Sequence, residues 1–280
     1  MAEDDKALVA APEEVAGRAA HAEVEPLPDP RACPNFDRLA VIYRWMELAT
    51  FGPWLHRTRC AFLNRLADRR RALVIGDGDG RFAAQLLRAH PAIAIDAVDA
   101  SPAMLRALVR RARFHAARVA PYVADARRWQ PVAKTYDLVV THFFLDCLTT
   151  DEVWRLAETV RGAVAEGSLW VVSEFAIPRN RFGKFVARPL VAALYFAFGA
   201  LTGLRIRRLP DYAAALRGAG FALVNRRTWL SGLLTSELWT VSSGSALARD
   251  PDARERHERH PQGPKPASHS GDFGATEAVP

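Results

Sequence analysis

Glycine and aspartate alternate in "GDGDG", residues 76–80, directly after the apolar run "ALVI". Glycine permits backbone conformations that other residues avoid, and it lets a ligand approach the main chain closely. The two carboxylates, Asp77 and Asp79, would repel a pyrophosphate, so a bound ligand should carry positive charge. A tight strand-to-helix turn without a ligand would use the same residues, and the segment alone does not separate these two interpretations.

Two more aspartates stand where the next two apolar runs end. Asp99 ends "IAIDAVD" and Asp125 ends "VAPYVAD", while Ser101 and Pro102 are typical of a helix start. A carboxylate after the second strand can accept hydrogen bonds from both hydroxyls of a ribose. One after the third strand could accept from an adenine amino group, although an aspartate there is commonly a turn residue. Together with the glycine segment, these acids indicate a positively charged adenosine derivative. S-adenosylmethionine (SAM) has both a sulfonium and an ammonium group.

Other nucleotide-binding motifs are absent from the sequence. A dinucleotide site requires G-x-G-x-x-G, whereas Arg81 stands where the third glycine would be. A phosphate-binding loop requires Gly-Lys followed by Ser or Thr, but Gly183 and Lys184 are followed by Phe185. The Tyr-x-x-x-Lys pair of many nicotinamide-dependent oxidoreductases does not occur either. A nicotinamide-dependent oxidoreductase is therefore a weaker alternative than a SAM-binding protein.

Apolar runs and helical patterns alternate through the middle of the chain, and their lengths fit strands joined by helical crossovers. The expected strands are residues 72–76, 93–99, 119–125, 136–142, 168–175, 221–229 and 236–243. The expected helices are 81–90, 101–113, 150–165 and a capped helix within 207–221 that ends at Gly218 or Gly220. The last two strands are close enough in sequence to pair antiparallel. The sequence thus predicts an α/β fold with three layers, in which a doubly wound, seven-stranded sheet is mostly parallel with one antiparallel strand. In such sheets, ligands bind at the carboxyl ends of the strands.

Residues 72–178 resemble a class I SAM-dependent methyltransferase, because "ALVIGDGDGRF", "AVDASPAML", "VADAR", "YDLVVTHFFLDCLT" and "LWVVSEFAIP" match its successive motifs in order. The resemblance implies a Rossmann-like domain that binds SAM at the ends of its first four strands. The implied contacts are Gly76, Asp77, Gly78 and Gly80 on the methionine side, Asp99 and Ala100 at the ribose, Asp125 and Ala126 at the adenine, and Thr141 after the fourth strand.

One position departs from the family. Val74 stands where many members carry an acid, so Asp77, Asp79 or water would contact the ammonium group instead. The segment "VIGDGDG" also resembles the loop of spermidine synthases, which are aminopropyltransferases that use decarboxylated SAM. No further motif of that second family occurs in the chain.

Methyl transfer from a sulfonium is an in-line displacement, and much of its rate can come from holding the acceptor in a closed pocket. A hydroxyl or carbon acid benefits from a general base, whereas an amine or thiol needs only its neutral state. His142, at the end of the fourth strand, is the first candidate for that base, and Tyr43 is a second catalytic candidate. A structural histidine, or one that contacts SAM, would also explain His142. Asp146 could line the acceptor site, or it could only cap or precede the helix near Thr150.

The flanks of the domain are similar to methyltransferases of ubiquinone and menaquinone biosynthesis. "FDRLAVIYRWMELATFGPWLHRTR", residues 36–59, resembles their N-terminal helix, and "SEFAIP" resembles the segment after their fifth strand. Within the folded region no [DN]-P-P-[YFW] motif, Pro-Cys dipeptide or metal-ligand cluster occurs, which disfavours nucleic-acid bases and metal-assisted catechols as acceptors. We expect a small-molecule or lipid-like acceptor, such as a quinol or phenol, and no metal. The alternative is a catalytically silent SAM-binding sensor or scaffold.

One apolar segment, "RPLVAALYFAFGALTGLR", covers residues 188–205. It is shorter than the roughly 20 apolar residues that a transmembrane helix needs. It could be a buried helix over the sheet, a lid over an apolar acceptor pocket, or an interfacial segment whose arginines meet lipid headgroups. We therefore expect an apolar helical insert at about 182–205, with a peripheral membrane contact through residues 185–208 as one of its roles.

The two ends of the chain differ from the middle in composition. Residues 1–33 and 244–280 lack a sustained apolar face, which predicts disorder on both sides of a single domain at 34–243. The 280-residue chain has a net charge of +7, but no nucleic-acid motif occurs and its arginines are scattered, so no nucleic-acid partner is expected. Three distant cysteines and an acidic start without an apolar signal core favour a cytoplasmic location. The sequence predicts no obligate protein partner.

Overall fold

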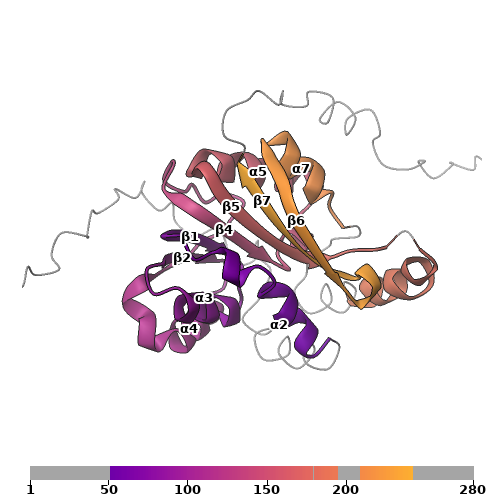
Figure 1. The fold of residues 1–280 in the computed structure, drawn as a ribbon, viewed down its shortest axis with the longest axis horizontal. Coiled ribbons are helices and arrows are strands. Elements are labelled where there is room, and N and C mark those ends of the chain that lie inside the picture. Colours follow the sequence, from indigo (N-terminus) through magenta and orange to yellow (C-terminus); the bar gives the residue numbers. More distant parts are fainter. Residues whose placement is uncertain (1–50, 179, 195–208, 242–280) are drawn as a thin grey trace, which may run out of the picture.

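The structure is a computed structural model that describes residues 51–178, 180–194 and 209–241. Within these residues, seven strands form one sheet in the order β3-β2-β1-β4-β5-β7-β6 (Figure 1). Their bounds are β1 (Arg71–Ile75), β2 (Ala94–Asp99), β3 (Val119–Val123), β4 (Tyr136–His142), β5 (Val164–Phe175), β6 (Phe221–Trp229) and β7 (Leu234–Val241). β7 runs antiparallel to β5 and β6, whereas the other neighbouring strands are parallel. The predicted seven-stranded sheet with one antiparallel strand is confirmed.

The sheet is doubly wound. From β1 the chain moves outward to β2 and β3, returns to β4 on the other side of β1, and continues to β5. The strand order therefore reverses between β1 and β4. In open sheets of this kind, ligands bind outside the carboxyl ends of the strands at such a point. The residues that follow Ile75, Asp99 and His142 are consequently the first place to look for a site.

Helices cover both faces of the sheet (Figure 1). One face carries α3 (Arg81–Ala89) and α4 (Pro102–Arg111), next to α2 (Pro53–Arg59), and the other carries α5 (Thr150–Ala163) and α7 (Tyr212–Gly218). Short 3₁₀ turns complete the connections: η1 (Leu63–Arg65), η2 (Arg113–Arg118), η3 (Leu145–Cys147) and η5 (Leu230–Gly232). The three predicted layers are therefore present.

β1 shows why the central strands are continuous apolar runs. Ala72 and Val74 pack into the core beneath α3, while Leu73 and Ile75 pack into the core beneath α5. Successive side chains of a strand point to opposite faces, and here both faces are covered by helices. All four side chains are at most 2% exposed.

Local capping residues fix where the helices begin. Ser101 caps α4 as predicted, because its hydroxyl accepts from the Met104 backbone N–H at 3.2 Å. Thr149 caps α5, and its side chain and that of Glu152 form a reciprocal capping box. Asp146 therefore does not cap α5, and it lies in η3 before that helix.

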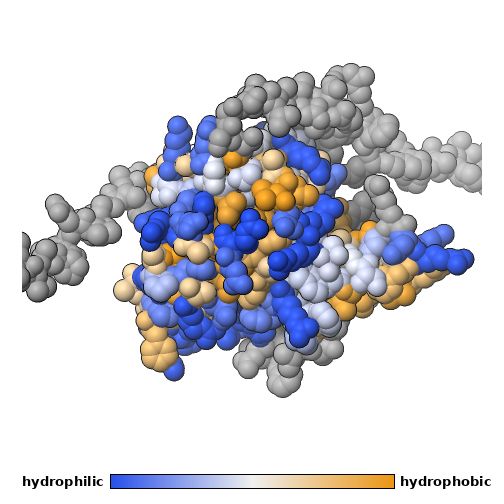
Figure 2. All heavy atoms as spheres, viewed as in Figure 1, coloured by the Kyte–Doolittle hydropathy of each residue, from blue (hydrophilic) through white to orange (hydrophobic). Residues whose placement is uncertain are grey.

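A third apolar cluster lies beyond the carboxyl ends of the strands. Residues 181–194 are helical, with a π-helical turn at Gly183–Ala187, and they bury Ala187 and Val191 against Phe51, Leu55 and the β6–β7 turn. In Figure 2, hydrophobic residues gather at the end of the molecule that carries this helix. The first part of the predicted insert at 182–205 is thus helical, and residues 195–208 lie outside the described residues.

Some predicted boundaries differ from the structure. β5 begins at Val164 rather than 168, because Val164 already pairs with Tyr136 before the register shifts between Tyr136 and Leu138. α7 ends at Gly218, one of its two predicted ends, and it begins only after Asp211, which caps it. The segments predicted to be disordered, residues 1–33 and 244–280, lie outside the described residues.

Candidate functional site

The loop between β1 and α3 is built by three glycines with positive φ. Gly76, Gly78 and Gly80 have φ values of 67°, 60° and 77°, which other residues rarely adopt. A Cβ on Gly76 would lie 2.3 Å from the Phe144 ring, and one on Gly80 would lie 2.6 Å from the Leu108 Cα. Gly78 differs, because its Cβ would meet only the Met104 sulfur, at 3.9 Å. Two glycines thus allow close packing, whereas Gly78 leaves space beside the main chain.

Asp77 has one paired and one unpaired carboxylate oxygen. Oδ2 accepts from the Ala83 backbone N–H at 2.9 Å and so caps the first turn of α3. Oδ1 is buried, and it has no hydrogen-bond partner among the described residues. Burial raises the pKa of Asp77 to about 7, although the hydrogen bond from Ala83 and the charge of Arg59 act in the opposite direction. An unpaired buried acceptor of this kind is suited to a cationic ligand.

Asp79 is engaged with the protein itself. Its Oδ2 accepts from Arg81 Nε at 3.2 Å and from Arg111 Nη2 at 2.7 Å. From the sequence, Asp77, Asp79 or water could contact an ammonium group. In the structure Asp77 has a buried oxygen without a described partner, which favours Asp77 over Asp79 for this contact. Val74, at the position where the sequence departs from the methyltransferases it resembles, is 1% exposed in the core beneath α3.

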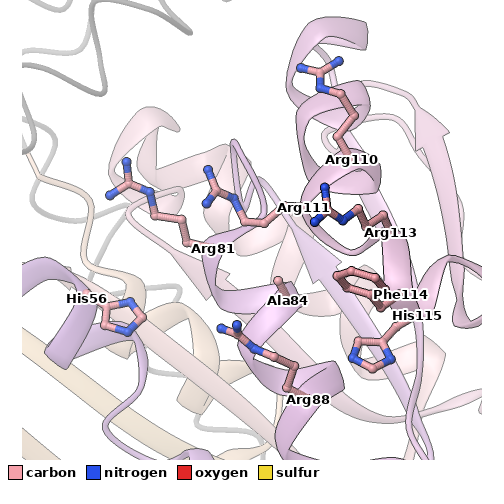
Figure 3. A pocket seen from close by; sticks show the side chains of 9 residues that line it. All are labelled: His56, Arg81, Ala84, Arg88, Arg110, Arg111, Arg113, Phe114 and His115. Carbon is pink, nitrogen blue, oxygen red and sulfur yellow. The ribbon is translucent and has the colours of Figure 1, made fainter.

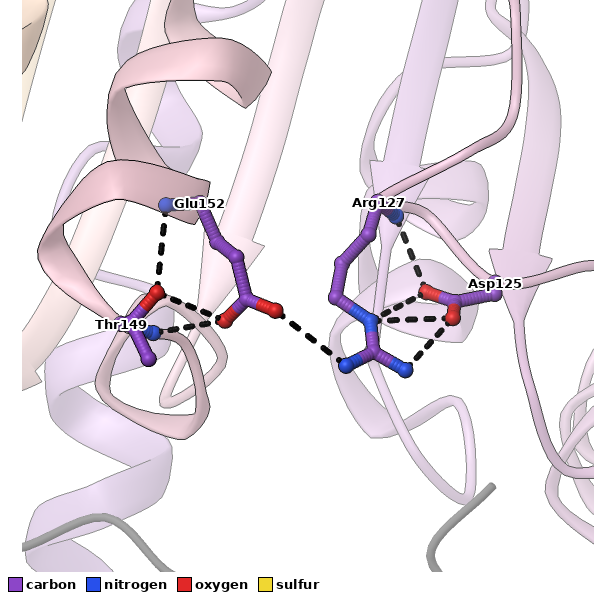
Figure 4. A network of polar contacts seen from close by, with 4 residues as sticks. All are labelled: Asp125, Arg127, Thr149 and Glu152. Atoms are coloured by element: carbon purple, nitrogen blue, oxygen red, sulfur yellow. Dashed lines mark hydrogen bonds and ion pairs between the residues drawn. The ribbon is translucent and has the colours of Figure 1, made fainter. Parts of the chain in front are cut away.

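The acids after β2 and β3 lie at the same edge of the sheet. Asp99 Oδ1 accepts from the Ser101 backbone N–H at 2.9 Å, so this carboxylate shapes the turn at Ala100. Asp125 is held by Arg127, whose backbone N–H, Nε and Nη2 all donate to it (Figure 4). Burial alone would raise the pKa of Asp125, but the hydrogen bonds from Arg127 outweigh it and keep the pKa below its usual value. Ala126, which lies between Asp125 and Arg127 in the chain, is partly buried against the core beneath α5.

Arg127 links Asp125 to the next strand connection. Its Nη1 donates to Glu152 Oε1 at 3.3 Å, and the other oxygen of Glu152 belongs to the capping box with Thr149 (Figure 4). Sequence reasoning did not anticipate this network, because no local pattern joins residues 125 and 152. Three N–H groups of Arg127 therefore donate to Asp125, and the Nε–H is shared between both of its oxygens.

At the end of β4, Thr141 and His142 face opposite sides of the sheet. Thr141 is fully buried, and its hydroxyl accepts from Trp170 Nε1 at 3.0 Å. His142 is 3% exposed and packs edge-on against Phe82, with ring centroids 4.4 Å apart. Neither ring nitrogen of His142 has a hydrogen-bond partner among the described residues. Burial, with a smaller effect from Arg59, holds the pKa of His142 well below its usual value, so the ring is neutral.

Two charged residues at this edge were not singled out from the sequence. Glu174, at the end of β5, is 1% exposed, and its Oε1 accepts from the backbone N–H groups of Phe144 and Leu145 at 3.2 and 2.8 Å. Burial, and then the neighbouring Asp146, raise the pKa of Glu174 well above its usual value. The signal was a lone acid in the apolar run "SLWVVSEF". Glu174 thereby positions the turn after β4, where Phe143 has a φ of 53°.

Arg59 is the second residue that sequence reasoning missed. It ends α2, is 6% exposed, and lies over the Phe143 ring at 5.2 Å from the centroid. Its charge influences the pKa of both Asp77 and His142. α2 therefore brings a buried cation close enough to Asp77 and His142 to affect their ionisation.

An aromatic cluster lies at the ends of β4 and β5. Phe175 lies 5.3 Å from Phe51 and 5.1 Å from Phe143, measured between ring centroids. These rings belong to the third apolar cluster, which also includes Leu55 and Leu234.

Tyr43, the other catalytic candidate from the sequence, lies outside the described residues. Among the described residues, no three His, Cys, Asp or Glu side chains gather as metal ligands.

Comparison with protein families gives one match. Residues 72–167, about a third of the chain, match the family model of a methyltransferase domain. This range runs from β1 into β5 and contains the glycine loop, Asp99, Asp125 and His142. No curated protein matches the sequence.

Several solved structures share the fold. An O-methyltransferase family protein from Burkholderia thailandensis is 18% identical, with a TM-score of 0.56 over 74% of this chain and 61% of that protein. Human N-acetylserotonin methyltransferase in complex with SAM is 17% identical, with a TM-score of 0.53 over 74% and 57%. N-methyltransferase NodS from Bradyrhizobium japonicum in complex with S-adenosyl-L-homocysteine is 15% identical, with a TM-score of 0.51 over 73% and 99%.

The chain thus spans only about 60% of the first two of these proteins, and the likeness concerns the fold. Strand order, helical layers and the matched family range all agree with one another. The described part of this chain therefore has the class I, Rossmann-like fold that these methyltransferases share, and residues 72–167 match the model of a methyltransferase domain.

Proposed function

We propose that this protein is a SAM-dependent methyltransferase that acts on a small or lipid-like apolar acceptor, such as a quinol or phenol. The observation that carries the proposal is the glycine loop, where space beside Gly78 adjoins an unpaired buried oxygen of Asp77. A folded protein rarely leaves a buried acceptor unpaired, because its desolvation costs about 1–3 kcal/mol. A cationic ligand at this point would satisfy the atom.

The cofactor-binding residues would divide the ligand between them. Asp77 Oδ1 would accept from the ammonium group, and Gly78 would let the methionine part lie against the main chain. Asp99, with Ala100 beside it, would receive the ribose hydroxyls. When bound, SAM would supply a methyl group on a positively charged sulfur, from which an in-line nucleophile can displace it.

The adenine end requires a rearrangement of one side chain. An adenine amino group would compete for Asp125 with the side-chain N–H groups of Arg127, which donate to both carboxylate oxygens. We place adenine beside Ala126 and infer that Arg127 then turns toward Glu152, to which it already donates. Thr141 would act through its contact with Trp170, which fixes the end of β4 behind the site.

The acceptor would lie in the aromatic cluster next to His142. Rings of Phe51, Phe143 and Phe175 would exclude water and hold an apolar ring by its faces. His142 is neutral, and a neutral imidazole can take a proton from an acceptor hydroxyl at an unpaired ring nitrogen. Tyr43 stays a second catalytic candidate.

A SAM-binding protein without turnover is the second candidate function. The observation that favours it is the burial of His142, which is only 3% exposed and lies against Phe82. A base must reach its substrate, and this ring would have to be uncovered by a movement of the turn after β4. The two functions agree on the cofactor and differ only in the fate of its methyl group.

The deciding experiment follows labelled methyl groups. Full-length protein, labelled SAM and a panel of quinols, phenols and amines should give a labelled apolar product. His142→Gln should lower turnover by about 100-fold or more while SAM affinity, measured by calorimetry, stays unchanged. SAM binding without product from any acceptor would favour the sensor or scaffold. Absence of SAM binding would overturn both candidates.

A matched pair of variants on β2 tests the cofactor residues. Asp99→Asn should weaken SAM binding by about tenfold or more, since it removes a charged acceptor. Asp96→Asn changes an acid three positions earlier, which contacts only protein groups. SAM affinity that falls equally in both variants would contradict the assigned role of Asp99.

We also propose a peripheral membrane contact through the helix at 181–194. Phe185 and Val186 are 66% and 48% exposed there, and Lys184 lies over the Phe185 ring at 5.4 Å. Within the described residues, none of the helices is long and apolar enough to cross a bilayer. Phe185→Ser should reduce flotation with anionic vesicles, whereas Val224→Ser, at an exposed site on β6, should not. Equal flotation of Phe185→Ser and wild type would contradict the contact.

A further inference from the structure

A pocket lined mainly by arginines lies beside the glycine loop. It has a volume of about 410 Å³ and lies between α2, α3, α4 and η2 (Figure 3). Its lining residues are His56, Arg81, Ala84, Arg88, Arg110, Arg111, Arg113, Phe114 and His115. Five of these are arginines, and none of the described lining residues is acidic. Figure 3 shows the guanidinium groups arranged around the pocket, so positive charge is concentrated there.

Helix dipoles explain only some of these arginines. Arg88 lies in the last turn of α3, and Arg110 and Arg111 lie in the last turn of α4, where cations stabilise a helix. Arg81 is different, because it is the first residue of α3, where the dipole disfavours a positive charge. The helix dipole therefore does not explain why an arginine stands at this position.

Two of the guanidinium groups are held in place by the glycine loop. Arg81 and Arg111 both donate to Asp79 Oδ2, and Arg111 Nε also donates to the Asp79 carbonyl oxygen at 3.0 Å. One carboxylate thus orients two cations while cancelling at most one positive charge. Ala84, 5% exposed on α3, leaves room between them.

An exposed aromatic ring borders the same pocket. Phe114 is 81% exposed, and Arg113 lies over its ring at 4.6 Å from the centroid. A ring that is this exposed contributes almost nothing to the core, whereas a cation–π contact pre-orients the guanidinium. The pocket therefore combines several arginines with one apolar surface.

We propose that this pocket binds a phosphate group carried by an apolar or aromatic body. Guanidinium groups form paired, charge-assisted hydrogen bonds with phosphate oxygens, and several of them can share one phosphate. The attached body would lie against Phe114. The site differs from the proposed cofactor site, because none of the residues that line this pocket is among those assigned to the cofactor. A soluble phosphate ester and a phospholipid headgroup share this chemistry.

Calorimetry with the full-length protein tests the site, using pyrophosphate and phenyl phosphate as probes and saturating SAM throughout. Both probes should bind saturably, and phenyl phosphate should bind more tightly than inorganic phosphate, which is titrated as a third probe. Arg88→Gln with Arg110→Gln should weaken binding by about tenfold or more, since two phosphate ligands are lost. Both residues are exposed, and neither contacts Asp79 in the described hydrogen bonds.

A matched control removes the same charge elsewhere. Arg65→Gln with Arg155→Gln changes two exposed arginines outside the pocket, and probe affinity should change by less than about twofold. Vesicles of phosphatidylcholine with and without phosphatidylglycerol identify the source of the phosphate. Flotation that depends on the anionic lipid and on the pocket arginines supports a headgroup, whereas binding of the soluble probes alone supports a phosphate ester.

Three results would overturn the proposal. The first is no saturable binding of either probe or of anionic vesicles. The second is an equal loss in the pocket and control variants, which would indicate general electrostatic attraction. The third is tighter binding of an RNA oligonucleotide than of phenyl phosphate, with equal losses in both variant pairs. SAM affinity is measured in the same series, so failure of the proposed function is seen separately.

Discussion

Two aspartates toward opposite edges of the same sheet, each with a buried carboxylate oxygen, have very different surroundings. At the amino edge, Asp96 on β2 is 4% exposed, and both of its oxygens have partners. Arg71 Nη2 donates to Oδ1 and Oδ2 at 3.0 and 2.9 Å, and the Tyr136 hydroxyl donates to Oδ2 at 2.8 Å. At the carboxyl edge, Asp77 has one oxygen paired with Ala83 and one without a described partner.

The same contrast extends to the neighbouring groups. At the carboxyl edge, both ring nitrogens of His142 and Glu174 Oε2 are buried without a partner among the described residues. At the amino edge, the unpaired atoms of Arg69 and Arg71 are Nε atoms whose guanidinium groups donate elsewhere. An edge that only supports the fold pairs its acids, whereas an edge that binds a ligand leaves acceptors for it.

The largest effect on stability is expected at Gly80, a glycine of the carboxyl edge that packs closely against Leu108. Gly80→Ala should lower the free energy of unfolding by about 3–5 kcal/mol, since it adds left-handed strain to a clash with Leu108. Gly162→Ala in α5 is the control, because a Cβ there meets nothing within 4 Å and should stabilise slightly. Urea unfolding of both variants checks this. Comparable stability of Gly80→Ala and wild type would show that the loop can relax.

The pH dependence of stability should separate Asp77 from Asp96. The folded pKa of Asp77, about 7, lies above its unfolded value, so the folded state binds more protons between about pH 4 and pH 7. Stability should therefore fall as pH rises through this range, by about 3 kcal/mol after allowing for partial exposure. Asp77→Asn should remove this loss and be more stable than wild type at pH 8.

Thermal unfolding between pH 4 and pH 8 measures this difference. At pH 4 the two proteins should differ by less than about 1 kcal/mol, because Asp77 is protonated in the folded state and about two-fifths protonated in the unfolded state. Saturating SAM should restore part of the lost stability of the wild type at pH 8, since a cation favours the charged carboxylate. Parallel pH profiles of the two proteins would contradict the unpaired, raised-pKa state of Asp77.

A smaller effect is expected at the amino edge. Asp96→Asn should cost about 2 kcal/mol of stability, less than a fully buried pair because the Arg71 side chain is 43% exposed. Tyr136→Phe removes one hydrogen bond from the same group and should cost about 1 kcal/mol. Chemical denaturation and SAM calorimetry check both. A clear loss of SAM affinity would place the amino edge in the binding site and so remove the contrast.

The smallest effect on stability is expected at Gly78, with a selective effect on binding. Gly78→Ala should cost about 1 kcal/mol in backbone strain, because its Cβ meets no close neighbour. Binding of SAM should weaken by about tenfold, since the added methyl group occupies space beside the main chain. Calorimetry on Gly78→Ala measures both. Unchanged SAM affinity would show that the ligand does not approach this part of the loop.

Much of the fold was predictable because it depends on local patterns. The apolar runs, the Ser101 cap and the antiparallel pairing of β6 and β7 follow from spacing along the chain. The early start of β5 was not predictable, since Val164 joins the sheet only through its pairing with Tyr136. Asp146 was open between two interpretations, and the capping box of Thr149 decides against its role as a cap.

In the candidate site, too, the order of residues was predictable from the sequence, whereas their hydrogen-bond partners were not. The sequence placed the three glycines and the acids Asp77, Asp99 and Asp125 in order at successive strand ends, because βαβ connections bring those ends to one edge. It could not show which acids keep free oxygens. Asp79 is paired with Arg111 from another helix, and Asp125 with Arg127 in a conformation that only the turn selects.

By itself, then, the sequence determined the strand and helix order, the glycine turn and the presence of acids around it, since period and spacing are properties of neighbouring residues. The tertiary structure decided which polar atoms are satisfied. Glu174 meets the turn at Phe144 across 30 residues, and Arg111 meets Asp79 across 32. Such pairs form only when packing brings distant segments together, and the desolvation of each buried atom depends on everything around it.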